Sequence, residues 1–148
     1  MDTDYRPADR WINWLLAASA GVSVFGLLLV LAPTLTRQGF SLMIYGATAT
    51  IDGFGAEQVR YISLAHAVLG GVMVGWGCAL FFAVKSFFAR NPRATWNLFG
   101  GSVLAWFIPD TAYSPVAGYW PNAVLNAGFA VIFGVPLWAT RGAKHSAG

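Results

Sequence analysis

Apolar residues along this chain gather into four long blocks, and ionisable residues are almost absent from them. The blocks run roughly over 11–32, 61–84, 94–108 and 119–140. A helix needs about 20 apolar residues to cross roughly 30 Å of hydrocarbon. Because lipid offers the backbone no hydrogen-bond partner, such blocks must be helical. The pattern predicts an all-α integral membrane four-helix bundle that forms one transmembrane domain over 1–148.

Local start and stop signals set the ends of the predicted spans. Pro33 stops the first span and Pro109 ends the third, since proline cannot continue the hydrogen bonding of a helix. Asn91-Pro92 is a capping residue followed by proline at the first helical position, so the third span begins there. The second span is expected to be long because helix formers continue without a breaker. The predicted spans cover approximately 11–32, 56–88, 93–109 and 120–140.

The basic residues are distributed unevenly around the spans. Only 10% of residues are charged, and the net charge is +3. Of the nine Lys and Arg, only Arg37 and Arg60 lie between the first and second apolar blocks. The other seven are Arg6, Arg10, Lys85, Arg90, Arg93, Arg141 and Lys144. The positive-inside rule then places both termini and the middle loop in the cytoplasm. The basic charge indicates topology and contact with anionic lipid, and we expect no nucleic-acid partner.

The first connection, 34–55, is the longest, and it is too apolar for a solvated linker. It holds Phe40, Met43, Ile44, Tyr45 and Ile51 among other apolar residues. We expect this extracytoplasmic loop to fold back over the outer end of the bundle.

Small residues recur at every fourth position through most of the second predicted span. They are Ser63, Ala67, Gly71, Gly75, Ala79 and Ala83. Small side chains let helix backbones approach closely, which is how spans associate where lipid removes the hydrophobic drive. The stripe predicts helix packing within the bundle, and the alternative is an interface with a second copy or with a partner membrane protein.

Polar side chains inside the apolar blocks gather toward the predicted outer side. Buried polar groups are costly in a membrane and are functional candidates by default. The candidate ligand-binding residues are His66, Asp110, Tyr113, Trp120, Asn122 and Asn126. Together they would form a polar pocket beneath aromatic residues, suited to a small or lipid-like molecule. Each also has a structural alternative, because such groups can bond between helices or cap a turn.

Standard catalytic signatures are missing from the sequence. Cys78 is the single cysteine, so an internal disulfide and a cysteine metal site are excluded. Two histidines, His66 and His145, cannot supply bis-histidine haem ligation in a monomer. We assign no catalytic residue, no metal ligand and no cofactor. A pair of His66 and Asp110 is the one arrangement that would permit acid–base chemistry.

One stretch resembles a known group of proteins. Residues 106–111 (WFIPDT) with 120–126 (WPNAVLN) are similar to a motif of uncharacterised bacterial four-span membrane proteins. The layout of the whole chain is broadly similar to DoxX-like membrane proteins, which have been linked to oxidoreductase partners and redox stress. The resemblance implies a bacterial inner-membrane setting, and it transfers no catalytic residue to this chain.

The sequence favours a non-catalytic accessory or interaction protein of the membrane. The missing catalytic motifs and the small-residue stripe carry this interpretation. The alternative is binding or transport of a small or lipid-like molecule at the outer polar residues. A membrane enzyme that uses His66 and Asp110 is the third hypothesis.

Overall fold

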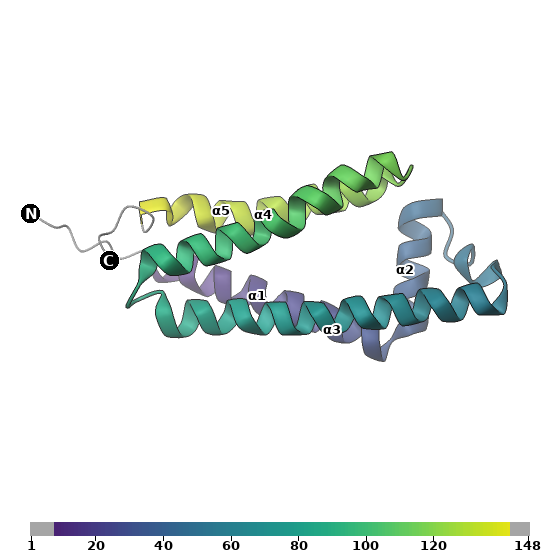
Figure 1. Cartoon of the computed structure of the whole chain (residues 1–148), viewed down its shortest axis with the longest axis horizontal. Helices are drawn as coiled ribbons and strands as arrows, with labels where there is room; N and C mark the ends of the chain where they lie inside the picture. The colour runs from purple at the N-terminus through teal and green to yellow at the C-terminus, as the bar shows by residue number, and fades with distance from the viewer. Residues whose placement is uncertain (1–7, 143–148) are drawn as a thin grey trace, which may run out of the picture. The chain divides into compact units, whose positions relative to one another are not determined.

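A computed structural model describes residues 8–142, and regular structure in this range is helical (Figure 1). The elements in chain order are α1 (Asp9–Leu31), α2 (Pro33–Tyr45), the short 3-10 helix η1 (Ile51–Gly53), α3 (Ala56–Phe87), α4 (Pro92–Val116) and α5 (Trp120–Ala139). The predicted all-α class is confirmed. Arg6, Lys144 and His145, which entered the sequence predictions, lie outside the described residues.

Three of the helices described here are long and apolar enough to cross a membrane. They are α1, α3 and α5, with 23, 32 and 20 residues. The fourth long helix, α4, has 25 residues, but it is not among the helices that combine this length with enough apolar character. The structure therefore supports a membrane protein with three candidate crossings, and the fourth predicted crossing stays a prediction.

The chain divides into two compact units, which we describe separately. The first, here called the hairpin unit, contains 8–20 and 79–142, and the second, called the crossing unit, contains 21–78. In the hairpin unit α4 and α5 run antiparallel (Figure 1). Residues 117–119 connect them, and Gly118 takes a φ of +83°, which suits glycine in a tight turn.

Rings and one indole bond join α4 to α5 along their length. Phe99 and Phe133 are buried with ring centroids 5.9 Å apart. One turn away from this ring pair, the Trp96 Nε1–H donates to the backbone oxygen of Leu137 at 3.0 Å. Aromatic pairs of this kind stabilise the contact beyond the area that they bury. These side chains therefore help to hold α4 against α5.

The start of α4 agrees with the sequence prediction, but its end does not. The Asn91 side chain accepts a hydrogen bond from the backbone N–H of Ala94 at 3.0 Å, and Pro92 occupies the first turn. The prediction that Pro109 ends this helix is wrong, because α4 continues to Val116 with Pro109 inside it. Proline is tolerated inside helices of membrane proteins where neighbouring helices and Ser or Thr side chains stabilise the backbone.

In the crossing unit α1 and α3 approach each other at a pair of glycines. A Cβ added at Gly26 would lie 2.6 Å from the backbone oxygen of Gly70. A Cβ added at Gly70 would lie 2.5 Å from the backbone oxygen of Gly26. Next to this contact, the Ser23 hydroxyl donates to the backbone oxygen of Val74 at 3.3 Å. Only glycine permits so close a crossing, as in small-residue helix pairs generally.

The connection between α1 and α3 is largely helical rather than a loop. Pro33 stops α1 as predicted, but the chain turns directly into the 13-residue helix α2. Pro33 supplies the first position of α2, where its missing N–H costs nothing. Gly46 ends the helix with a φ of 75°, and its N–H donates to the oxygen of Leu42. Within the crossing unit, α2 stands crosswise to α3 (Figure 1).

Candidate functional site

Two amides of α5 bond to side chains of α4 and form what we call the amide cluster: Asp110, Thr111, Ser114, Asn122 and Asn126. The Asn122 Nδ2 donates to the Asp110 Oδ1 at 2.9 Å and to the Ser114 Oγ at 2.8 Å. The Ser114 hydroxyl in turn donates to the backbone oxygen of Asp110 at 2.7 Å. Both hydrogens of the Asn122 amide are therefore engaged with α4.

The second amide lies one turn further along α5. Asn126 is buried, and its Nδ2 donates to the Thr111 Oγ1 at 3.2 Å. Residues four apart share a face of a helix, so Asn122 and Asn126 present their amides to the same side. The two bonds place a polar seam between otherwise apolar helices.

The structure brings together Asp110, Asn122 and Asn126, three of the six predicted ligand-binding residues. Ser114 was not among the six, although it lies four residues after Asp110 and so on the same helix face. This relation was hidden in the sequence because Pro109 was expected to end the third helix, which would leave Ser114 in a loop. The amide nitrogens of Asn122 and Asn126 both donate to side chains of α4, which is the arrangement expected of an interhelical brace.

The two aromatic residues predicted to cover this pocket are largely exposed. Tyr113 is 71% exposed and Trp120 is 66% exposed. Tyr113 belongs to α4 rather than to a loop, because that helix continues past Pro109. That these two side chains cover the polar residues stays a prediction.

A second polar group, here called the Arg37 cluster, joins α2, η1 and α3 through Arg37, Phe40, Asp52, Ser63 and His66. The Arg37 Nε donates to the Asp52 Oδ1 at 3.0 Å, which makes an ion pair between α2 and η1. The Arg37 Nη1 donates to the Ser63 Oγ at 2.9 Å, which ties the same side chain to α3. The sequence pattern indicates only a loop charge at Arg37 and does not predict this contact.

His66 lies one turn after Ser63 on α3 and is partly buried. Its ring lies against Phe40, with centroids 4.9 Å apart and a tilt of 37°. Its Nδ1 is buried and has no hydrogen-bond partner among the described residues. A buried polar atom without a hydrogen-bond partner lowers stability, so this position is a candidate for a role other than packing, such as binding a ligand.

His66 and Asp110 belong to different units, the crossing unit and the hairpin unit respectively. The prediction that they share a pocket therefore stays a prediction. Within its own unit, Asp110 is engaged by Asn122. Within its own unit, His66 contacts the ring of Phe40. Neither contact supplies the partner that acid–base chemistry would need.

The predicted small-residue stripe does not contain the glycine of the observed helix crossing. That glycine is Gly70, whereas a Cβ at Gly71 or Gly75 would meet no atom of the described residues within 4 Å. Adjacent residues point about 100° apart around a helix, since 3.6 residues complete one turn. Of the remaining stripe residues, Ser63 bonds to Arg37, while Ala67 is half-buried, Ala79 exposed and Ala83 buried.

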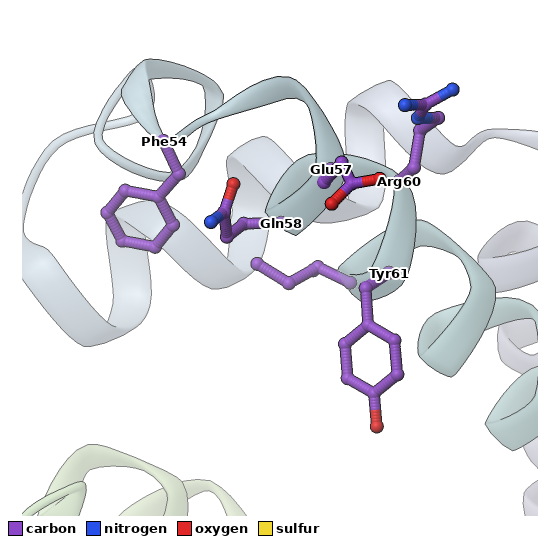
Figure 2. A pocket seen from close by; sticks show the side chains of 6 residues that line it. Phe54, Glu57, Gln58, Arg60 and Tyr61 are labelled. Atoms are coloured by element: carbon purple, nitrogen blue, oxygen red, sulfur yellow. The ribbon is translucent and has the colours of Figure 1, made fainter.

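A shallow hollow of about 660 Å³ lies at the start of α3 (Figure 2). Its lining residues are Phe54, Glu57, Gln58, Arg60, Tyr61 and Ile62. The rings of Phe54 and Tyr61 lie at two ends, and the charged groups of Glu57 and Arg60 lie away from them (Figure 2). Small-molecule sites have convergent polar groups within an enclosed pocket. This open hollow lacks both features and contains none of the predicted ligand-binding residues.

Among residues 8–142, no three His, Cys, Asp or Glu side chains come together in a group that could hold a metal ion. Comparison of the chain with protein-family models, curated proteins and solved structures finds no match. The resemblance to DoxX-like proteins therefore stays a prediction. Fold and composition define an all-helical protein with three helices able to cross a membrane.

Proposed function

We propose that the chain is a four-crossing protein of the bacterial inner membrane with both termini in the cytoplasm. Its 25 residues give α4 a length of roughly 37 Å at about 1.5 Å per residue, enough to cross the hydrocarbon core. The polar groups of Asp110, Thr111 and Ser114 that lower its apolar character are covered by the amides of α5. A hairpin of α4 and α5 can therefore enter the membrane together.

In this membrane the protein acts as a non-catalytic accessory or interaction subunit. The observation that carries this proposal is the bonding within the amide cluster: Asn122 donates both amide hydrogens, one to Asp110 and one to Ser114. The Asp110 Oδ1 is therefore used for a contact between α4 and α5, which favours a bracing role. The cluster thus serves to hold α4 against α5.

The partner is a second copy of the chain or another membrane protein, and it binds the open small-residue face of α3. Gly71 and Gly75 support this choice because nothing in residues 8–142 lies within 4 Å of a Cβ built there. Bare glycine positions on a helix in lipid allow the backbone of a second helix to approach closely.

Native mass spectrometry of the protein extracted with its own lipids tests this role. Wild type is expected to appear in a complex larger than the monomer, and Gly71→Leu is expected to lose that complex. The matched control is Gly128→Leu, the same enlargement on α5 at another open glycine. A monomer for wild type, or equal complexes for both variants, contradicts the accessory role.

A second candidate function is binding of a small lipid-soluble molecule at His66. The unpartnered Nδ1 beside the ring of Phe40 favours it, because a ligand donor or acceptor could complete the hydrogen bonding of the imidazole. In the same mass spectra, a discrete extra mass that disappears in His66→Ala but survives in Asn122→Ala would support this function. Identical small-molecule masses in all variants would exclude it.

A further inference from the structure

The helix α2 has its polar and apolar faces reversed relative to a helix on a soluble protein. Ser41 is 0% exposed, and Thr36 and Arg37 are also turned inward. On the opposite side, Leu35 is 63% exposed and Leu42 is 53% exposed. These two leucines are seven residues apart, which places them on the same face after about two turns. A surface helix of a soluble protein would show the opposite distribution.

The inward polar groups are satisfied by the protein itself. The Ser41 hydroxyl donates to the backbone oxygen of Ala47 at 2.6 Å and accepts from the N–H of Ile51 at 3.2 Å. The Thr36 hydroxyl donates to the backbone oxygen of Ala32 at 3.2 Å. Arg37 is held by Asp52 and Ser63, as described above. The inner side of α2 therefore needs no water, which is the condition for backbone and side chains at membrane depth.

The position of α2 along the chain indicates what covers its outer face. Only Ala32 separates the end of α1 at Leu31 from Pro33 of α2, and α1 is a candidate membrane-crossing helix. Leu28 and Leu31, at the end of α1, are themselves exposed leucines. The apolar surface thus continues from the lipid-facing part of α1 onto α2. The last residue of α2 is Tyr45, which is also exposed. Tyrosine is enriched at the boundary between membrane and water.

We propose that α2 is an interfacial helix that lays Leu35, Leu42 and Tyr45 into the acyl-chain boundary of the lipid bilayer. Interfacial helices usually turn a charged face to water, whereas α2 turns its polar face to the protein. The ion pair of Arg37 with Asp52 and the bond to Ser63 fix that orientation. This inference rests on the membrane insertion proposed above.

Spin-label accessibility in vesicles of phosphatidylethanolamine and phosphatidylglycerol tests the proposal. A label at Leu42→Cys, in a Cys78→Ala background, is expected to collide more often with oxygen than with a water-soluble nickel chelate. Thr48→Cys, at an exposed polar position in the turn after α2, is expected to give the reverse ratio. Leu35→Cys provides a second reading on the same apolar face if the first variant does not fold.

A third labelled position separates this proposal from the membrane insertion on which it rests. Val72→Cys is exposed in the middle of the candidate crossing helix α3. If Val72→Cys prefers oxygen while both α2 positions prefer the nickel chelate, α2 faces water and the inference is overturned. If the α2 positions are protected from both reagents, a protein covers this face and the inference is likewise overturned. If Val72→Cys also prefers the nickel chelate, the insertion itself fails.

Discussion

The crossing of α1 with α3 and the hairpin of α4 with α5 both join largely apolar helices, but different groups hold them. At the crossing, Gly26 and Gly70 bring the two backbones together because neither residue has a side chain. In the hairpin, the amides of Asn122 and Asn126 reach across to α4. Lipid removes the hydrophobic drive between helices, so close packing and hydrogen bonds remain as the two means of association. The crossing combines the glycine contact with one hydrogen bond from Ser23, whereas the hairpin combines ring packing with several side-chain hydrogen bonds.

This difference has a consequence for how each pair responds to substitution. A glycine contact fails when any atom is added, since backbone atoms on the other side have little freedom to move. An amide bond fails when atoms are removed, since a polar partner is then left unpaired. Enlargement is therefore the sharper probe of the crossing unit, and truncation is the sharper probe of the hairpin unit.

The largest effect is expected for Gly70→Ala. The new Cβ would lie 2.5 Å from the backbone oxygen of Gly26 and 2.9 Å from the Cβ of Leu29, so the helices must separate. Overpacking of this kind costs roughly 3 kcal/mol of unfolding free energy, the upper end of the usual range. Unfolding in mixed micelles with increasing SDS, followed by circular dichroism, measures it.

A glycine of α1 outside the proposed partner face provides the matched control for this prediction. A Cβ at Gly21 would meet no described atom within 4 Å, so Gly21→Ala should gain about 1 kcal/mol from the higher helix propensity of alanine. Equal losses for Gly70→Ala and Gly21→Ala would show that the crossing does not depend on the Gly26–Gly70 contact.

The next effect is expected for Arg37→Met in the same unit. Methionine keeps most of the aliphatic stem but removes the bonds to Asp52 and Ser63. A hydrogen bond to a charged group contributes roughly 2 kcal/mol to stability, so we expect the unfolding free energy to fall by about that amount. Arg60→Met, at an exposed position on α3, is the control and should change stability little. If both variants unfold at the same SDS fraction, the ion pair does not hold α2.

A smaller effect is expected for Asn122→Ala in the hairpin unit. The variant leaves the carboxylate of Asp110 and the hydroxyl of Ser114 without the Asn122 amide, and interhelical bonds in membranes contribute roughly 1 kcal/mol. A double-mutant cycle with Asp110→Ala measures the coupling between the two side chains. Asn97→Ala, on an exposed face of α4, is the control. Additive losses for Asn122 and Asp110 would contradict the brace.

Much of the helical layout was predictable, because long apolar blocks and capping residues act locally. The cap at Asn91, followed by Pro92, marked the start of α4 correctly. The prediction for Pro109 was wrong because it considered only the local effect of proline on helix hydrogen bonding. In the structure α4 continues past Pro109, where its side chains bond to α5. The helix α2 was not predicted because its 13 residues include Pro33 and Gly39 and lack an apolar block.

The polar seam was predictable in part, and the Arg37 cluster was not. Asp110, Asn122 and Asn126 are conspicuous as polar residues beside or within apolar sequence, and the structure brings them together in one unit. Arg37 and Asp52 are 15 positions apart on elements that the sequence did not reveal, so their pairing depends on the fold. The stripe failed to identify Gly70 because periodicity alone does not tell which face of a helix meets its neighbour.

The last effect is small, and it is a gain of stability rather than a loss: it is expected for His66→Phe. Phenylalanine keeps a ring against Phe40 but removes the buried Nδ1 that lacks a partner. Removing an unpaired buried polar atom should raise the unfolding free energy by about 1 kcal/mol. Ser63→Ala, one turn earlier on α3, removes an acceptor that Arg37 uses and should lower it.

This last pair of variants also decides between the two candidate functions. A stabilised His66→Phe means that the imidazole nitrogen is unpaired in the isolated protein, as an interhelical histidine without a ligand would be. A destabilised His66→Phe means that the nitrogen gains a partner in the membrane, which the ligand-binding alternative requires. Repeating the unfolding after exhaustive delipidation separates a bound molecule from a bond within the protein, because only the former is lost with the lipid. The His66 Nδ1 has no partner among the described residues, whereas the amides of Asn122 and Asn126 are hydrogen-bonded to α4. Variants of His66 therefore test the protein's role most directly.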